Sequence, residues 1–410
     1  MSRPLHRPLD ALRRLRVTMF AGASGRVLTT VAFGWLLVLG VRLVIPTLLP
    51  RISAEFGLGH TVGGSLFTLL LVVAALMQFP GGVLADRAGG RAVLFLGLLF
   101  TGLGVLLMTV APLFVAFVVG VGLFGLGTGL YGTPRVTVLS TIFPERDGTA
   151  IGITSAAGNV GTAVLPVVAT AVAVAFGWRN GFAFALPLFV ATTAAVWVVV
   201  PADLERSGGE RTVRGDGRLV LRAMRDSTVV RATVVMMVVF FVYQGFTAFL
   251  PTYYVEVKSL SEDVAATLYG AFFAGGILAQ VAFGNLGDRY PPHRLIPLLV
   301  GVSGGLILLL PFTDDVASLA VLSVLSSAQL GFWPIAFSYT IGTLPEEVRS
   351  SGLGLLRTVY LLVGSLGSVA VGVLADAGHF DGAFLFLGGC MFLAVLWSLG
   401  LPALAARPNS

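Results

Sequence analysis

Twelve long apolar runs follow one another along the chain, and this pattern limits the possible folds more than any other feature of the sequence. An α-helix needs about 20 apolar residues to cross the hydrocarbon core of a bilayer. Only 11% of the 410 residues are charged, whereas about a quarter are charged in a globular domain. We therefore exclude an ordinary soluble enzyme and predict an all-α membrane protein with twelve transmembrane helices. The runs are 27–49, 64–85, 92–111, 114–138, 149–176, 181–200, 229–254, 264–286, 294–312, 317–342, 352–375 and 383–404.

Basic residues are distributed unevenly over the loops. If the N-terminus is inside, the inner segments hold 20 of the 26 Lys and Arg residues and the outer loops hold three. Short loops rich in Lys and Arg stay on the cytoplasmic side, so we expect a multi-pass protein of the cytoplasmic membrane with both termini inside. The run after the basic N-terminus is too long for a signal peptide. The use of arginine in place of lysine suggests a prokaryotic source.

The two halves of the chain repeat each other around a long polar stretch. Residues 78–87 match residues 280–289 at an offset of 202, and 144–146 echo 345–347. Parallel repeats of this kind are typical of secondary transporters with a site near the bilayer midplane. The expected parts are an N-terminal segment 1–26, a six-helix bundle 27–200, a linker 201–228, a six-helix bundle 229–404 and a tail 405–410.

The loop between the second and third runs carries a motif, Gly82-x-Leu84-Ala85-Asp86-Arg87-x-Gly89-Gly90-Arg91. This motif resembles the loop signature of the major facilitator superfamily, and the twelve runs, linker and repeat extend the resemblance over the whole chain. The resemblance implies two pseudo-symmetric six-helix bundles and a latch that stabilises one conformation. A second copy of the latch would use Gly284, Asp288, Arg289 and Arg294, although Tyr290-Pro291-Pro292-His293 replaces the usual glycine and basic residue.

Glycines in the fourth and fifth runs predict close helix contacts and a helix bend. Residues 127–132 fit a dinucleotide-binding string, but no soluble strand precedes them, so we interpret Gly120, Gly122, Gly125, Gly127, Gly129 and Gly132 as a packing face. The family commonly has an arginine near Val121 that is linked with proton coupling, and this chain lacks it. In the fifth run Gly158, Gly161 and Pro166 resemble the pattern where the family's helix bends. Gly158-Asn159-x-Gly161 also resembles nitrate porters, whose paired arginines are missing here.

Three arginines lie within the apolar runs, while every Asp and Glu lies in a loop or at the end of a run. A charge inside the membrane is costly and usually faces a cavity or a partner. Arg42 lies about two turns inside the outer end of its run, which favours a cavity. Arg135 and Arg357 are closer to the inner boundary, where snorkelling, a latch role and ligand binding remain alternatives. Arg42 also resembles the first-span arginine with which organophosphate and anion:cation symporters hold an anionic substrate.

Polar and aromatic residues within the runs are further candidates for substrate contacts. The repeat relates Arg42 to Gln244, next to Tyr243. The other candidates are Asn159, Tyr131, Trp333 and Tyr339. The four histidines are scattered in loops, so no metal spacing occurs.

Together these features predict a secondary transporter of a small organic anion, with carboxylate favoured because arginine can hold it bidentately. The alternatives are a proton-coupled multidrug efflux antiporter, a nitrate/nitrite porter, and a membrane sensor or scaffold that does not transport. The expected partners are a small-molecule substrate, the lipid bilayer and a coupled proton or sodium ion. We expect a monomer that has no cofactor and binds no nucleic acid.

Overall fold

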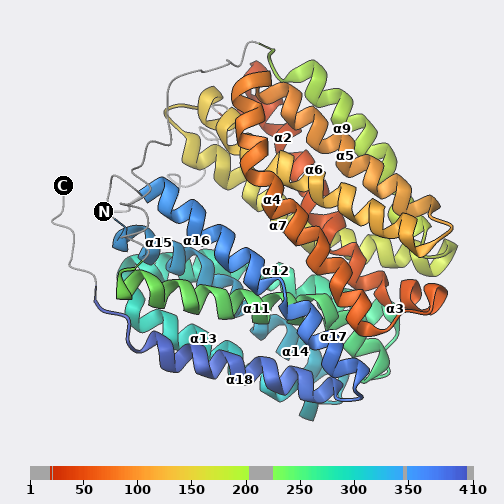
Figure 1. Ribbon diagram of the computed structural model, residues 1–410, viewed down its shortest axis with the longest axis vertical. Helices are drawn as coiled ribbons and strands as arrows, with labels where there is room; N and C mark the ends of the chain where they lie inside the picture. The colour runs from red at the N-terminus through yellow and green to blue at the C-terminus, as the bar shows by residue number, and fades with distance from the viewer. Residues whose placement is uncertain (1–18, 21, 203–224, 345–348, 404–410) are drawn as a thin grey trace, which may run out of the picture. The chain divides into compact units, whose positions relative to one another are not determined.

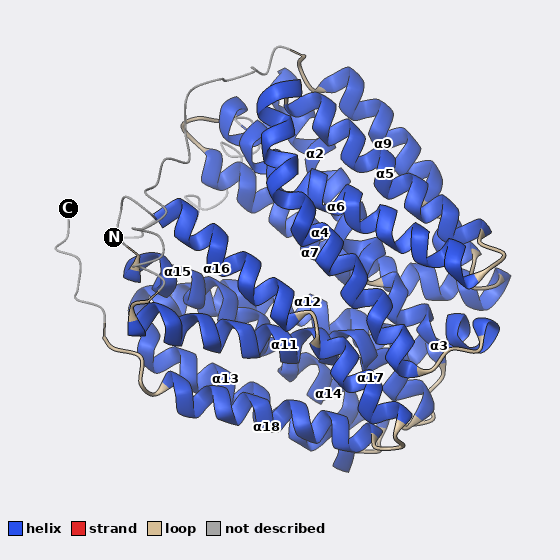
Figure 2. Cartoon of the chain, in the orientation of Figure 1, coloured by secondary structure: helices blue, strands red, loops and turns tan. Residues whose placement is uncertain are grey.

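Helices account for all regular structure in the part of the chain that the structure describes. This computed structural model describes residues 19, 20, 22–202, 225–344 and 349–403, and no strand occurs within them (Figures 1 and 2). Twelve helical segments there are long and apolar enough to span a membrane, which confirms the twelve predicted crossings. Helices suit this environment because each segment satisfies its own backbone hydrogen bonds where no water is available.

The N-terminal half forms six spans, of which the first and the sixth each consist of two helices. The helices are α2 (Gly22–Arg42), α3 (Val44–Phe56), α4 (His60–Ala88), α5 (Gly90–Val110), α6 (Phe114–Ile142), α7 (Asp147–Phe176), α8 (Asn180–Ala183) and α9 (Leu186–Val199).

The C-terminal half also forms six spans. Short 3-10 helices, η1 and η2, occur in the ninth and tenth of all twelve spans, and the eleventh consists of two helices. The elements are α11 (Ser227–Glu256), α12 (Glu262–Arg289), α13 (Pro292–Leu309), η1 (Leu310–Phe312), α14 (Val316–Ser326), η2 (Ser327–Gly331), α15 (Phe332–Thr343), α16 (Arg349–Gly364), α17 (Gly367–Asp376) and α18 (Phe380–Ser398).

The first span differs from the single run predicted at 27–49. It extends from Gly22 to Phe56 and is interrupted at Leu43, between α2 and α3. Pro46 lies four residues after Arg42 and has no N–H to donate to the Arg42 carbonyl. The interruption therefore has a local cause that can be read from the sequence.

Contacts divide the chain into two compact units. The described part of unit 1 comprises residues 19–42 without residue 21, 76–165 and 182–202. Unit 2 comprises 43–75, 166–181, 225–344 and 349–403. Portions of the first, second and fifth spans thus group with the C-terminal helices, whereas the sequence predicts separate bundles at 27–200 and 229–404. That division into bundles stays a prediction, as does the linker, of which 203–224 lie outside the described residues.

In unit 1, α5 and α6 approach each other closely through glycines, and α9 lies beside α5 (Figure 1). A Cβ atom at Gly104 would lie 2.6 Å from the Phe124 nitrogen and 2.7 Å from the Gly120 oxygen. One at Gly97 would lie 3.2 Å from the Gly127 oxygen. Gly120 and Gly127 therefore form the predicted packing face, whereas Gly122 has open space around its Cβ position.

In unit 2, α13 lies beside α18 (Figure 1), and α3 packs on α11 and α12. Successive spans alternate in direction, so the loops 57–59, 177–179, 257–261, 313–315 and 377–379 lie at the same end of unit 2. We call this end the distal side. The N-terminal half of α4, residues 60–75, lies against α17 there.

Small residues and hydroxyl groups line the contact between α4 and α17, which we call the distal seam. Thr68 donates its hydroxyl to the Ser365 carbonyl at 2.7 Å and lies 2.8 Å from the Ser368 hydroxyl. A Cβ at Gly372 would lie 2.5 Å from the His60 oxygen, and a Cβ at Gly64 would overlap the Ser368 oxygen. The two backbones are therefore as close as glycine allows.

The glycine contact between α5 and α6 predicts a specific loss of stability. Gly104→Val would push the two backbones apart, and overpacking of this kind costs about 1–3 kcal/mol of unfolding free energy. We expect this loss in an SDS titration of the protein in mixed micelles, monitored by circular dichroism. Gly122→Val is the matched control, because a Cβ atom at Gly122 would meet nothing within 4 Å. Equal losses in both variants would contradict the packing role.

Candidate functional site

Arg135 lies in a buried cluster of unit 1. It is only 7% exposed, and its Nη1 atom donates a hydrogen bond to the Thr154 hydroxyl oxygen at 2.9 Å. Its Cζ atom lies 4.1 Å from the centroid of the Trp35 ring, a distance at which a cation is attracted by the face of an indole. Arg135 thus joins α6 to α2 and α7.

Tyr131 lies one turn before Arg135 on α6 and belongs to the same cluster. Its ring is nearly parallel to that of Trp35, with the centroids 6.3 Å apart. Its hydroxyl donates to the Val31 carbonyl at 3.0 Å. Two of the predicted binding residues, Tyr131 and Arg135, are therefore neighbours, and both make contacts that hold α2 against α6.

Arg42 lies at the C-terminal end of α2, where the first span is interrupted. Its side chain is partly buried. The Nε atom is buried and has no hydrogen-bond partner among the residues that the structure describes. No salt bridge of Arg42 with a carboxylate occurs among those residues either. The end of a helix also carries backbone carbonyls without helical partners, so donors and acceptors are concentrated at this point.

The C-terminal candidates in unit 2 include part of an aromatic cluster on α11, α15 and α16. The Trp333 centroid lies 5.8 Å from that of Phe240 and 5.5 Å from that of Tyr360. Tyr243 lies 6.1 Å from Phe240. Arg357 is exposed and lies one turn before Tyr360 on α16. The structure thus brings together Trp333 and Tyr243 through Phe240.

Gln244 and Tyr339 lie elsewhere in unit 2. Gln244 is 1% exposed, and its Nε2 atom has no hydrogen-bond partner within the described ranges. Tyr339 is also buried, and its hydroxyl donates to the Pro402 carbonyl at 2.9 Å. The Tyr339 hydroxyl thus holds the chain after α18, whereas the Gln244 amide can still donate.

The predicted bend residues of α7 make close contacts with α2 in unit 1. A Cβ at Gly158 would lie 2.7 Å from Trp35 Cδ1, and one at Gly161 would overlap the Leu36 carbonyl oxygen. Pro166 lies inside α7, which continues to Phe176. Asn159 is partly buried, and its carbonyl accepts a bond from the Thr162 hydroxyl. The glycines therefore serve packing, while a bend at this place stays a prediction.

The first motif loop has a backbone that requires glycine. Gly89, between α4 and α5, has φ +87° and ψ 147°, a conformation that other residues rarely adopt. Arg91 places its Cζ atom 4.5 Å from the centroid of the Trp197 ring on α9. Gly82 is partly buried on α4, and Arg87 is exposed. The side chain of Asp86 lies outside the part of the structure that is described.

The second motif loop differs from the first. α12 ends at Arg289, and Tyr290 follows with an extended backbone, φ −120°. Gly284 is partly buried, Arg289 and Arg294 are exposed, and the Asp288 side chain is not among those described. The latch function of both loops stays a prediction.

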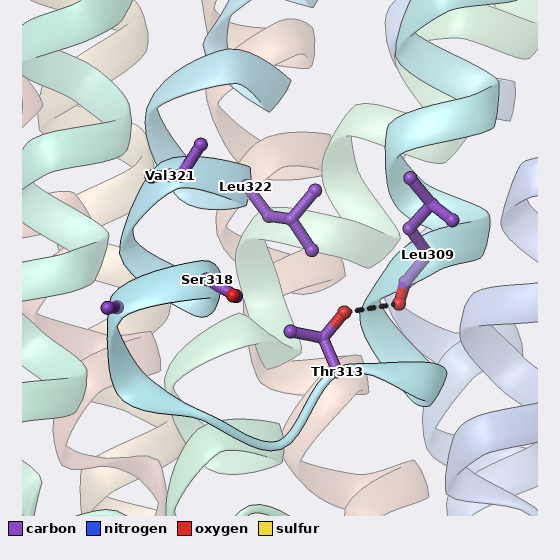
Figure 3. Close-up of a pocket in the computed structure, with 6 residues that line it drawn as sticks. Leu309, Thr313, Ser318, Val321 and Leu322 are labelled. Atoms are coloured by element: carbon purple, nitrogen blue, oxygen red, sulfur yellow. Dashed lines mark hydrogen bonds between the residues drawn. The ribbon is translucent and has the colours of Figure 1, made fainter.

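A shallow groove on unit 2 opens between α13 and α14 on the distal side. Thr313 donates its hydroxyl to the Leu309 carbonyl at 2.9 Å (Figure 3). No charged residue lines the groove, so it offers no partner for a charged solute. The lining residues are Leu309, Thr313, Ala317, Ser318, Val321 and Leu322.

Comparison with known proteins decides the family. A sequence model of the Major Facilitator Superfamily matches residues 30–303 and 258–410. The chain belongs to the Major Facilitator Superfamily. It is therefore a membrane transporter of this superfamily and not an enzyme.

Individual relatives of this superfamily member are distant. A "Probable nitrate/nitrite antiporter NarK1" of Thermus thermophilus is 29% identical over 68% of this chain and 64% of the relative. A "Gentisate transporter" of Corynebacterium glutamicum is 26% identical over 86% of this chain and 82% of the relative. A bacterial homologue of the human lysosomal transporter Spinster, solved in an inward-facing and unoccupied conformation, has a TM-score of 0.76 at 16% identity. It covers 90% of this chain, and this chain covers 94% of it.

Four residues that contact the predicted site residues of this superfamily member were not predicted from the sequence: Trp35, Thr154, Phe240 and Tyr360. An aromatic residue or a threonine within an apolar run is most often a packing residue, so no local signal separates Trp35, Thr154 and Phe240 from other residues of the runs. The spacing of Arg357 and Tyr360, three residues apart on one helix face, was a usable signal.

The contact of Arg135 predicts the effect of two threonine substitutions on α7. Thr154 and Thr162 are both buried, and each donates its hydroxyl to the carbonyl three residues earlier, but only Thr154 accepts the bond from Arg135. Thr154→Val leaves a buried charged donor without this acceptor, which costs about 1–3 kcal/mol. Thr162→Val serves as the control and should cost clearly less in the same SDS titration. The assigned role of Arg135 is wrong if Thr162→Val is the more damaging change.

Proposed function

We propose that this protein carries a small organic anion, with carboxylates favoured, across the cytoplasmic membrane by alternating access. The observation that carries the proposal is the buried Nε atom of Arg42, which has no hydrogen-bond partner among the described residues. An arginine in a membrane span is costly unless it pairs with another group. A bound anion would supply this partner.

The chemistry of arginine favours a carboxylate. A guanidinium group presents two parallel N–H donors, and a carboxylate accepts both at once. The Asp and Glu residues of this chain lie in loops or at the ends of the apolar runs, so a cationic substrate would meet an arginine without a nearby acidic residue. This charge balance supports an anion over the lipophilic cation of a multidrug antiporter.

The names of two relatives agree with an anionic substrate. One is named for nitrate and nitrite and the other for gentisate. Both relatives are too distant for their names to establish the substrate of this chain, but the names support the choice of anions as the first compounds to test.

The basic inner loops support an orientation with both termini in the cytoplasm. The distal side then faces outward, and the motif loops with Gly89 and Arg91 face the cytoplasm. Gln244, Tyr243, Asn159, Trp333 and Arg357 remain candidates for further substrate contacts.

The test is ligand-induced thermal stabilisation of the purified protein in detergent. Aliphatic and aromatic carboxylates, phosphates, nitrate, nitrite and lipophilic cations are compared in the wild type and in Arg42→Ala. A ligand at 100 times its Kd stabilises the folded state by about 2.7 kcal/mol. We expect one class of carboxylate to raise the Tm of the wild type and to have no effect on Arg42→Ala.

Arg231→Gln is the matched control, because it removes the same charge from an exposed position where the guanidinium bonds the Gly400 carbonyl. This variant should keep the response to carboxylates. Stabilisation by lipophilic cations alone, unchanged in Arg42→Ala, would refute the anion assignment and favour multidrug efflux. Stabilisation by nitrate or nitrite alone would favour the porter, and no response to any class would favour a sensor or scaffold.

A further inference from the structure

His60 lies between two carboxylates at the distal end of α4. Its Nε2 atom lies 2.8 Å from a carboxylate oxygen of Glu256, at the end of α11. Its Nδ1 atom lies 2.9 Å from a carboxylate oxygen of Asp376, at the end of α17. One imidazole ring therefore connects parts of three spans, the second, the seventh and the eleventh.

Asp376 also bonds the backbone of α4. Its two carboxylate oxygens accept the N–H groups of His60 at 2.6 Å and of Thr61 at 2.8 Å. These are among the first N–H groups of the helix, which have no partner within it, and a negative charge at this end is favoured by the helix dipole. The carboxylate of α17 thus serves as the N-terminal cap of a helix from the other half of the chain.

The two contacts of the His60 ring require the charged imidazolium. A carboxylate accepts hydrogen bonds, and a neutral imidazole carries only one N–H. In the neutral form one ring nitrogen would therefore direct its lone pair at a carboxylate oxygen, whereas the protonated ring can donate to both. The geometry is complementary to a bound proton.

Among the described residues, the charged partners of the His60 ring are the carboxylates of Glu256 and Asp376. The rings of Phe249 on α11 and Phe380 on α18 lie 6.3 and 5.3 Å from the imidazole. The neighbouring Asp381 of α18 accepts the hydroxyl of Tyr253 at 2.5 Å. Three other distal acids are held by cations: Glu262 by Arg51, Glu55 by Arg179 and Asp314 by Lys258. Asp315 accepts the Ser318 N–H at 2.9 Å.

We propose that His60, Glu256 and Asp376 form a proton-binding site that keeps the distal seam closed. With the proton bound, the ring holds α4 against the ends of α11 and α17. When the proton leaves, the same three groups carry two negative charges and one unsatisfied contact, and the seam loosens. This inference rests on the proposed transport function, for which it names the proton as the ion that controls access from the outer side.

The seam is suited to such control because, apart from the ring and the Asp376 cap on the first N–H groups of α4, its described contacts are neutral. They consist of the hydroxyl contacts of Thr68 and the close approach of Gly64 and Gly372. His60 lies next to these glycines, so a change of its charge acts on the point where the backbones are closest.

The test measures the distance from α4 to α14 as a function of pH; α14 packs on α12 and α13 and serves as a reference within unit 2. Spin labels are attached to cysteines at Ser65 on α4 and Val316 on α14, both exposed, in a Cys390→Ser background, and distances are recorded by double electron–electron resonance in detergent without substrate. In the otherwise unchanged protein we expect one short distance at pH 5.5 and an added longer distance at pH 8.5. This interval brackets the titration of histidine near pH 6.5.

The variants separate a specific proton site from a general effect of pH. His60→Gln should show the longer distance at both pH values, and Glu256→Gln should weaken the response to pH. His379→Gln is the matched control: His379 is an exposed histidine of the same side, with no carboxylate contact among the described residues, and it should respond as the unchanged protein does. Size-exclusion profiles and thermal unfolding show whether each variant is folded.

The proposal is overturned if the distances do not depend on pH, or if folded His60→Gln keeps the full response. No substrate is present in this experiment, so its result does not depend on whether the Arg42 test succeeds. If ligands fail to stabilise the protein but the distances respond to pH, only the anion assignment is refuted. If a carboxylate stabilises the protein but the distances do not respond to pH, only the proton site is refuted.

Discussion

A backbone amide inside a lipid bilayer has no water to bond, and this constraint underlies the whole structure. Each span satisfies its own N–H and C=O groups by forming a helix, which leaves side chains to decide how the helices meet. Lipid is as apolar as leucine, so close packing replaces the hydrophobic effect between helices. The glycines at 97, 104, 120 and 127 show this in unit 1, and those at 64 and 372 show it at the distal seam.

The same lack of water determines where charge is tolerated. Arg135 lies in the apolar part of unit 1 with the Thr154 hydroxyl and the Trp35 ring as neighbours. At the distal ends of the spans the charges instead form pairs such as Arg51 with Glu262. Arg42 differs from Arg135 because no hydroxyl, carboxylate or aromatic ring contacts its guanidinium among the described residues. This difference distinguishes a candidate for binding from a residue that holds helices together.

The sequence predicted the spans well because the length of an apolar run is tied directly to the thickness of the bilayer. The packing role of Gly120 and Gly127 was also predictable, since glycines in a span leave room for a neighbouring helix. Partners were harder to predict. Trp35 lies 100 residues before Arg135, and His60 is separated by 196 residues from Glu256 and by 316 from Asp376, so neither cluster has a local pattern. The break at Leu43 was readable from Pro46, yet the hydropathy of the run concealed it.

The chain passes from one unit to the other at 42–43, 75–76 and 165–166, within the first, second and fifth spans, and again at 181–182, at the start of the sixth. A proline lies near each of the first three crossings: Pro46, Pro80 and Pro166. Because proline has no N–H, the carbonyl four residues earlier loses its helical bond, at Arg42, Leu76 and Thr162. The bending stiffness of a helix comes from this ladder of bonds, so the chain is most compliant at these three crossings, where its contacts change from one unit to the other. At these points the backbone hydrogen bond that would resist bending is already missing.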